Sequence, residues 1–378
     1  MPDGFVSQLT AWRHYLHAHP ELSREEKGTA AFVRAQLDEM GIPYEAGIGG
    51  HGVVATLSRR GSNRSVGLRA DMDALPIREA TGKPYASTNP GIMHACGHDG
   101  HTASLLGAAR LLKDDPDWSG RIHLVFQPAE EGANGAQAML DEGLLTRFPM
   151  DRIFGYHNWP GGEAGAVFLR SGPIMAGAAQ FEVTLKGGAG HAALPDLCRD
   201  PVQGLAQLIV ALNTIVARNL PPAEAGVIST CTLKAGEAHN QIPETAVMGG
   251  TIRAFSVSAM ALLKRRLTEL ANGIAASFEL EAQVTIEEGL QPTVNSAAET
   301  ELARQAAQAA GLKLGPSFEP TMGAEDFGCF LQNIPGAFAV IGNGVTSPGL
   351  HTPTYDYNDE ILPIAARFLT ECAKTALR

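Results

Sequence analysis

The chain has 378 residues, of which 44% are hydrophobic and 18% are charged, and its net charge is −11. This length exceeds what a single hydrophobic core usually supports, so two domains are expected. The negative charge, with no run of Lys or Arg, excludes the electrostatic footprint of a protein that binds nucleic acid or an anionic membrane. No apolar stretch of the sequence reaches the length of a membrane span.

The cysteines and the first residues of the chain are informative about the cellular compartment of the protein. Five cysteines, an odd number, are scattered at positions 96, 198, 231, 329 and 372. This pattern argues against a disulfide framework and favours a reducing compartment. The first residues, Met-Pro-Asp-Gly, carry no basic segment followed by an apolar one, so no signal peptide is expected. The sequence predicts a cytoplasmic protein.

The first predicted element is a helix that ends at Gly41. Residues 23–26 (Ser-Arg-Glu-Glu) match a capping box, and apolar residues follow at helical spacing: Ala30, Val33, Leu37 and Met40. Three histidines precede this helix: His14, His17 and His19. A metal site there is conceivable, but polar histidines at a helix end are the favoured interpretation.

Apolar segments typical of buried strands alternate with helical segments in much of the chain. Strands are predicted at 53–57, 66–70, 122–126, 153–156 and 337–341, and an amphipathic helix at 102–112. Such alternation indicates an α/β sheet that is covered on both faces. Open α/β sheets gather active-site residues at the carboxyl ends of their strands. Five chemically active residues lie at or beyond such ends: Asp71, Glu130, Glu131, His157 and His351.

The middle of the chain has a different periodicity of apolar residues. Residues 181–186 alternate with period two, which predicts a sheet with one buried face. Further elements are predicted as a helix at 201–218, strands near 227–233 and 246–255, a helix through Leu263 and Ile274, and a strand at 283–286. This βαββαβ order is the ferredoxin-like pattern. We therefore expect an α/β domain formed by residues 1–177 and 289–378 and an inserted ferredoxin-like α+β domain (178–288).

The stretch Met93–His101 (MHACGHDGH) concentrates a thiol, three imidazoles and a carboxylate in nine residues. Thiolate and imidazole together suit zinc and its first-row neighbours. Cys96 and His98 are two residues apart, so a strand or a turn can aim both at one point, whereas a helix cannot. A buried free cysteine beside surface histidines is the alternative, but free cysteine rarely has so many polar neighbours without a chemical role.

Distant residues complete a candidate metal site. Five residues qualify as ligands: Cys96, His98, Glu131, His157 and His351. Five ligands are one too many for a closed tetrahedral site but suit two metals that share a bridging water or ligand. Adjacent side chains diverge in an extended chain, so Glu130 can face the bridging water as general base while Glu131 binds metal. The alternatives are a solvated Glu-Glu pair and hydrogen-bonded loop histidines.

Several segments resemble the dinuclear metallohydrolases that include aminoacylases and bacterial carboxypeptidases, and most closely their hippurate hydrolase and indole-acetyl-amino-acid hydrolase branch. The resemblance spans essentially the whole chain and implies a phosphorylase/hydrolase-like α/β catalytic domain with a mixed sheet for residues 1–177 and 289–378. It rests on Leu68–Pro76, Met93–His101, Gln127–Gly132, Gly155–His157, Gly190–His191, Ala324–Phe327 and Leu350–His351.

The resemblance implies roles for particular residues and for the inserted domain. It assigns the metal ligands and the general base to the residues named above, with two divalent ions per subunit (zinc, manganese, nickel or cobalt). The inserted domain is implied to be a lid and a homodimerisation surface. His191 is implied to stabilise the oxyanion, Asn240 and Arg253 to hold the substrate carboxylate, and Asp73 to orient metal ligands from a second layer.

The function that this resemblance implies is hydrolysis of N-acyl-L-amino acids with hippurate-like, N-acetyl or indole-acetyl groups. Three alternatives stay open. A dipeptidase or aminopeptidase of the same superfamily would accept a free amino group. A cysteine-nucleophile amidase would use Cys96 with a neighbouring histidine and would resist chelators. A non-catalytic metal-binding protein would need neither Glu130 nor Arg253.

Overall fold

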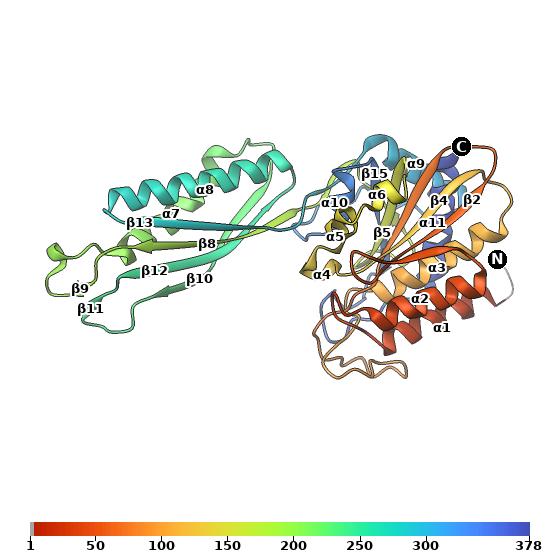
Figure 1. Cartoon of the computed structure of the whole chain (residues 1–378), viewed down its shortest axis with the longest axis horizontal. Helices are drawn as coiled ribbons and strands as arrows, with labels where there is room; N and C mark the ends of the chain where they lie inside the picture. The colour runs from red at the N-terminus through yellow and green to blue at the C-terminus, as the bar shows by residue number, and fades with distance from the viewer. Residues whose placement is uncertain (1–3) are drawn as a thin grey trace. The chain divides into compact units, whose positions relative to one another are not determined.

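The structure, a computed structural model, describes residues 4–378 and divides into two units (Figure 1). The larger unit contains the described residues up to Ile174 together with Val294–Glu319 and Asp326–Arg378. The second unit contains Met175–Thr293 and Pro320–Glu325. Among the described residues, no helix is long and apolar enough to cross a membrane.

A seven-stranded mixed sheet forms the centre of the larger unit, with strand order β1-β2-β4-β3-β5-β15-β6. Its strands are β1 (Tyr44–Ile48), β2 (Gly52–Arg59), β3 (Ser65–Asp71), β4 (Gly120–Gln127), β5 (Arg152–Pro160), β6 (Val167–Phe168) and β15 (Gly336–Gly344). The four central strands β4, β3, β5 and β15 are parallel, whereas β1, β2 and β6 join antiparallel. The predicted mixed α/β sheet and its five strands are confirmed.

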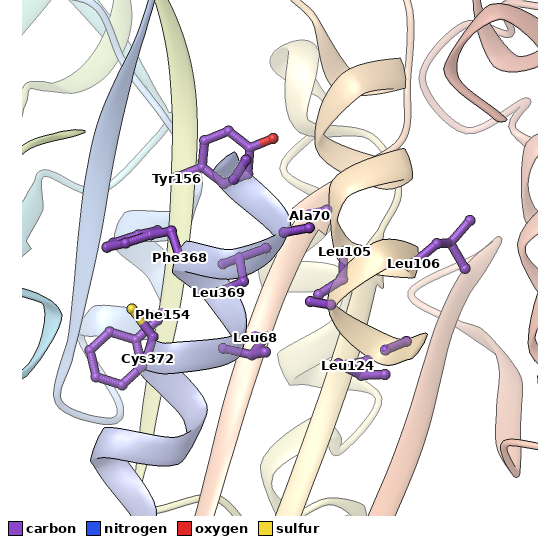
Figure 2. Packing of buried hydrophobic residues seen from close by; sticks show 14 of the residues in the cluster. Leu68, Ala70, Leu105, Leu106, Leu124, Phe154, Tyr156, Phe368, Leu369 and Cys372 are labelled. Atoms are coloured by element: carbon purple, nitrogen blue, oxygen red, sulfur yellow. The ribbon is translucent and has the colours of Figure 1, made fainter. Parts of the chain in front are cut away.

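One face of this sheet packs against five helices in a single apolar core. They are α1 (Phe5–Ala18), α2 (Lys27–Met40), α3 (His98–Asp114), α9 (Ala297–Ala309) and α11 (Leu362–Leu377). Figure 2 shows Leu68 and Ala70 of β3 beside Leu105 of α3 and Leu369 of α11 in this core. The side chains of all four residues are almost completely buried. Burial of a leucine side chain stabilises the fold by roughly 1.5–3 kcal/mol.

The opposite face of the sheet is covered by shorter helices. They are α4 (Glu130–Ala133), α5 (Gly135–Asp141), α6 (Leu144–Arg147) and α10 (Phe327–Leu331). The rings of Phe327 and Phe338 lie so close to Gly155 that a Cβ added there would be 3.0 Å from each. All seven residues of β3 are buried, as the prediction of a sheet covered on both faces requires.

The second unit is built on a four-stranded antiparallel sheet with order β10-β12-β8-β13. Its elements are β8 (Gly177–Lys186), α7 (Pro201–Asn219), β10 (Gly226–Ala235), β12 (Thr245–Ala254), α8 (Val257–Ser277) and β13 (Glu281–Glu288). Burial alternates along β8, because one sheet face packs on the two helices. The predicted βαββαβ order is confirmed.

Short elements complete the chain. In the second unit, β9 (Gly190–His191) pairs with β11 (Gln241–Ile242), and a 3₁₀ turn η1 spans Pro195–Leu197. Strands β7 (Gly172–Met175) and β14 (Thr293–Asn295) form a two-stranded ribbon, and a second 3₁₀ turn η2 (Asp359–Ile361) precedes α11.

The predicted capping box at residues 23–26 is wrong. Helix α2 begins at Lys27, so Ser23 is too far upstream to reach its first free N–H groups. The Glu21 carboxylate accepts two of these N–H groups instead, from Gly28 at 2.9 Å and from Thr29 at 2.8 Å. The Ser23 hydroxyl donates to Asp73 Oδ2 at 2.6 Å. The Ser-x-x-Glu pattern therefore does not cap α2 in this chain.

The prediction of polar helix-end histidines is confirmed for His17, which lies in the last turn of α1, but its burial was not predicted. This residue lies inside α1 and is completely buried, with Nδ1 2.8 Å from Asp99 Oδ2 and Nε2 3.2 Å from Glu79 Oε1. Burial works against its positive charge, but the two carboxylates outweigh burial and raise the pKa of His17 to about 9. His17 is thus an internal cation that ties α1 to the start of α3.

Candidate metal centre

A sharp turn before α3 presents the first two candidate ligands. Cys96 lies in the turn and His98 is the first residue of the helix, so the two side chains are not constrained by helical geometry. Gly97 between them has φ 95°, and a Cβ there would lie 2.3 Å from Asn158 Nδ2 and 2.5 Å from Tyr355 Oη. Only glycine fits this position, which explains the Cys-Gly-His sequence.

Four segments of the larger unit bring the five predicted ligands together. Cys96 Sγ lies 3.3 Å from His157 Nε2 on β5 and 3.4 Å from His351 Nε2, in the loop after β15. Glu131 Oε1 lies 3.3 Å from His351 Nε2 and 3.9 Å from His98 Nε2. Of the five, only His351 is substantially exposed, with 51% of its side chain open to solvent. The cluster is therefore a largely buried group of soft and imidazole donors.

The donor atoms fall into overlapping groups of three whose members lie within 4.8 Å of one another. One group is Cys96, His98 and His157, a second is Cys96, Glu131 and His351, and a third is His98, Glu130 and Glu131. Within residues 4–378, neither His98 Nε2 nor Glu131 Oε1 has a hydrogen-bond partner, although both atoms are buried. Buried polar atoms without partners are uncommon unless they coordinate an ion. The donor set fits two divalent transition-metal ions.

A second layer of hydrogen bonds orients the imidazoles. His98 Nδ1 donates to the Asp73 carbonyl at 2.9 Å and lies 3.2 Å from its Oδ1, while His157 Nδ1 donates to the Asn158 carbonyl at 2.6 Å. These bonds leave the Nε2 atoms of both rings directed at the cluster. The N–H of Glu131 donates to Asp73 Oδ2 at 2.9 Å. Asp73 thus contacts two of the predicted ligands, His98 and Glu131.

Glu130 and Glu131 project from a strained turn at the end of β4. Ala129, just before them, has φ 57°, in the left-handed region, and Glu131 departs from helical geometry within α4. Glu130 is 7% exposed, and its Oε1 accepts a hydrogen bond from the Asp326 N–H at 3.4 Å. The turn therefore places an oxygen of each carboxylate within 4.8 Å of a His98 ring nitrogen.

Comparisons with known proteins agree with this geometry. Residues 67–375 match the model of peptidase family M20/M25/M40. The chain belongs to this family.

Two curated relatives cover nearly the whole chain. An N-acetyl-L-cysteine deacetylase of Bacillus subtilis is 42% identical over 98% of this chain and 88% of its own length. A hippurate hydrolase of Campylobacter jejuni is 37% identical over 97% of this chain and 96% of its own. Among solved structures, a dinuclear metal-binding M20 peptidase of Bacillus subtilis superposes with a TM-score of 0.89 at 33% identity, covering 100% of this chain and 99% of that one.

Acidic residues dominate the electrostatics of the centre in this M20 protein. Burial raises the pKa of the Cys96 thiol well above its usual value, and the carboxylates of Glu131, Glu130 and Asp71 raise it further. Burial opposes the protonation of His98, yet Asp71 and Asp73 raise its pKa to about 10. Both shifts reflect an excess of negative charge that a divalent cation offsets, and a coordinating thiol loses its proton. The same surroundings oppose the activation of Cys96 as a nucleophile, which needs a lowered pKa.

Sequence reasoning missed a supporting network behind the ligands. His101 lies 2.7 Å from Asp71 Oδ1 through Nδ1, and its Nε2 accepts hydrogen bonds from both nitrogens of Asn158 at 3.1 Å. Asn158 also donates to the Cys96 carbonyl at 2.7 Å, which fixes the ligand turn. The signal was present in the sequence, because His98 and His101 are three residues apart and so share one face of α3.

A buried arginine, Arg69, pairs with two carboxylates of the same network. Arg69 Nη1 lies 2.7 Å from Asp71 Oδ2, and its Nη2 lies 2.9 Å from Asp326 Oδ1. Gln127 accepts a third hydrogen bond from Arg69 Nε at 2.8 Å. Burial would raise the pKa of Asp71, but His98, His101 and Arg69 outweigh it and hold this pKa well below its usual value. Asp71 is thus a permanently charged support for the histidines.

The predicted substrate-binding residues lie in the second unit. His191 and Asn240 are exposed neighbours, since the Ala192 N–H donates to the Asn240 carbonyl at 3.0 Å. Arg253, on β12, is half-buried, and its Nη1 donates to the Met322 carbonyl at 3.5 Å. Arg253 pairs with Ala178 at the start of β8, whereas His191 follows the end of that strand at Lys186. Eight residues of strand separate the two ends, roughly 25 Å.

Proposed function

We propose that this M20 protein hydrolyses the amide bond of N-acyl-L-amino acids to a carboxylic acid and a free amino acid. The observation that carries the proposal is the convergence of one thiol, three imidazoles and two carboxylates at one buried point of the larger unit. Two relatives that cover most of the chain act on N-acylated amino acids by name, an N-acetyl-L-cysteine deacetylase and a hippurate hydrolase. Free-amine substrates are named for neither of these two relatives.

We assign the ligands of two divalent ions to Cys96, His98, Glu131, His157 and His351. Cys96, His98 and Glu131 each belong to two of the three donor groups described above, so the groups share these residues. When bound, such ions lower the pKa of a water molecule and polarise an acyl carbonyl. Zinc, manganese, nickel and cobalt all suit thiolate, imidazole and carboxylate donors.

Glu130 is assigned the proton transfers of the reaction. Its carboxylate takes the proton of the attacking water, holds it on an oxygen, and delivers it to the amine nitrogen as the amide bond breaks. A carboxylate that is mostly buried and adjacent to the ligand Glu131 suits this role. The hydrogen bond from the Asp326 N–H limits the rotation of the side chain between the two transfers.

We assign substrate recognition to the second unit. We propose that its residues 178–288 act as a lid. Arginine pairs with a carboxylate through two parallel hydrogen bonds, so Arg253 is assigned the α-carboxylate. His191 is assigned the oxyanion, and Asn240 is its neighbour. An amino-acid derivative cannot span the roughly 25 Å of strand between His191 and Arg253 within one chain. We therefore propose a homodimer in which each site takes these residues from different copies.

A hydrolysis panel with and without chelator tests the proposed function. The purified protein, loaded with zinc or manganese, is offered hippurate, N-acetyl amino acids, an indole-acetyl amino acid and matched dipeptides with a free amino group. We expect turnover of the acylated substrates, loss of activity in chelator and recovery with added metal. Cleavage of dipeptides alone would indicate a peptidase, and chelator-resistant activity that is abolished by thiol alkylation would indicate a cysteine nucleophile.

A further inference from the structure

The segment Ser23–Glu26, which forms no capping box, contacts the turn that carries the two glutamates. Ser23 and Glu26 lie outside the residues that match the family model, 67–375. Glu26 is completely buried, and its Oε1 accepts the Ala129 N–H at 2.7 Å. Ser23 reaches the same region through Asp73, whose Oδ2 accepts the Ser23 hydroxyl at 2.6 Å. Two side chains more than a hundred residues away in sequence from Glu130 thus contact its surroundings.

Glu26 holds a backbone conformation that the turn would not adopt easily on its own. Ala129 has φ 57°, which costs a residue with a Cβ roughly 1–2 kcal/mol. Its N–H is bound by Glu26, and its carbonyl accepts the Gly135 N–H at 2.9 Å. The same Glu26 oxygen accepts the N–H of Arg24 at 2.9 Å, and Arg24 also has a left-handed φ of 69°. One buried oxygen atom therefore fixes two strained residues.

Ser23 binds Asp73, whose carboxylate contacts two proposed ligands, Glu131 and His98. Asp73 Oδ2 accepts both the Ser23 hydroxyl and the Glu131 N–H, while Asp73 Oδ1 lies 3.2 Å from His98 Nδ1. The Ser23 hydroxyl thereby restricts the rotation of the Asp73 carboxylate. Any rotation of this carboxylate would change the orientation of Glu131 and of the His98 ring together.

We propose that Ser23 and Glu26 are positioning residues that hold Glu130 and Glu131 in the geometry for proton transfer and metal binding. The catalytic part of this inference rests on the proposed function, whereas its metal-binding part does not need turnover. Loss of second-layer contacts typically lowers metal affinity or activity about 10–100-fold. The alternative is that Glu26 merely stabilises the start of α2.

The test compares two glutamates that each accept two backbone N–H groups beside the same helix. Glu26→Ala removes the bonds to Ala129 and Arg24, and the control Glu21→Ala removes those to Gly28 and Thr29. Zn²⁺ affinity is measured by competition with a chromophoric chelator, kcat and KM with an N-acetyl amino acid at saturating Zn²⁺, and Tm by calorimetry. Burial raises the pKa of Glu26 to about 7, so Glu26→Gln closely mimics its neutral form and serves as the conservative variant.

We expect Glu26→Ala to weaken Zn²⁺ binding about 10–100-fold and to lower kcat at least about tenfold with KM nearly unchanged. Glu26→Gln should stay within about threefold of the unaltered protein, because its amide oxygen still accepts the Ala129 N–H. Glu21→Ala should lower Tm but leave Zn²⁺ affinity and kcat unchanged. Should Glu26→Ala fail to fold, Ser23→Ala replaces it and should weaken Zn²⁺ binding at least about tenfold.

The inference is overturned if Glu26→Ala, or Ser23→Ala in its place, lowers Tm like Glu21→Ala while Zn²⁺ affinity and kcat stay unchanged. It is also overturned if Glu21→Ala weakens Zn²⁺ binding as much as Glu26→Ala does. If Zn²⁺ affinity falls as expected but the unaltered protein cleaves no N-acyl amino acid, the positioning role stands and the proposed function fails.

Discussion

The two units of this M20 protein hold their candidate functional residues in opposite ways. In the larger unit, His98 and His157 are buried, and each ring is fixed by a hydrogen bond through Nδ1. In the second unit, His191 and Asn240 are exposed, and the hydrogen bond that joins their segments is between backbone groups. The candidate metal centre is therefore preorganised by buried side-chain hydrogen bonds of its own unit, whereas His191 and Asn240 are exposed to solvent. This difference predicts that changes in the larger unit alter chemistry and metal binding, and changes in the second unit alter substrate selection.

The largest expected effect separates the two neighbouring glutamates. Glu130→Gln keeps the shape of the side chain but removes the basic oxygen, so kcat should fall about 10²–10⁴-fold while metal content stays normal. Glu131→Gln should instead lose metal and regain part of its activity in excess metal. Steady-state kinetics combined with metal analysis checks both variants. Metal loss in Glu130→Gln together with metal retention in Glu131→Gln would mean that the two roles are reversed.

Cys96→Ala tests the proposed thiolate ligand, which belongs to two of the donor groups. Removal of the thiolate should lower metal affinity by more than the roughly 10–100-fold that is typical of second-layer changes, and activity should fall with it. Equilibrium dialysis against Zn²⁺ gives the affinity. Cys329→Ala is a matched control, because Cys329 is also buried in the larger unit but belongs to none of the donor groups found among the described residues. Full metal loading and normal turnover of Cys96→Ala would remove Cys96 from the centre.

Arg253→Ala tests the second unit and should act on substrate selection rather than on metal binding. For substrates with a free α-carboxylate, kcat/KM should fall by an amount equivalent to roughly 2–4 kcal/mol, as for truncation of a desolvated charge pair. The corresponding carboxamides should lose much less, because they carry no charge for the guanidinium to bind. Equal losses for acid and amide would assign Arg253 a purely structural role.

The smallest expected effect concerns stability and the internal cation His17. Its folded pKa of about 9 exceeds the ordinary value of 6.5, so its stabilising contribution is complete below pH 6.5 and is lost as the pH rises through 9. The charged groups that face it are Asp99, Glu79 and Arg13. Urea unfolding of the unaltered protein and of His17→Gln should show a stability difference that shrinks by about 1–3 kcal/mol between pH 6.5 and pH 9.5. A difference that is independent of pH would show that His17 is neutral in the folded state.

The sequence predicted what depends on periodicity and on unusual residue types. Alternating and continuous apolar runs located five of the seven strands of the larger sheet and the four strands of the smaller one, and the stretch around Cys96 indicated the candidate metal centre. Local pattern failed where a side chain bonds to a distant segment. Ser23 and Glu26 match a capping box, yet they contact Asp73 and Ala129. His17 lies at a helix end as predicted, but the sequence did not show that tertiary packing buries it between two carboxylates.

The network that supports the candidate ligands was only partly visible in the sequence: the spacing of His98 and His101 places both on one face of α3, but it does not show that Asn158 lies beside them. Asn158 and His101 become meaningful only when β5 and α3 lie side by side, because their hydrogen bonds join residues 57 positions apart. The separation of His191 from Arg253 follows from the pairing register of the strands in the second unit. The sequence alone does not fix this register to one residue.

The count of metal ions per chain tests the central claim most directly. Purified protein is stripped with chelator, reloaded with Zn²⁺ or Mn²⁺, desalted and analysed by inductively coupled plasma mass spectrometry, and the rate of hydrolysis is followed in parallel. The account predicts two ions per chain at full loading, with hydrolysis of N-acyl amino acids that appears as metal is restored. A fully active protein that holds no metal would contradict it.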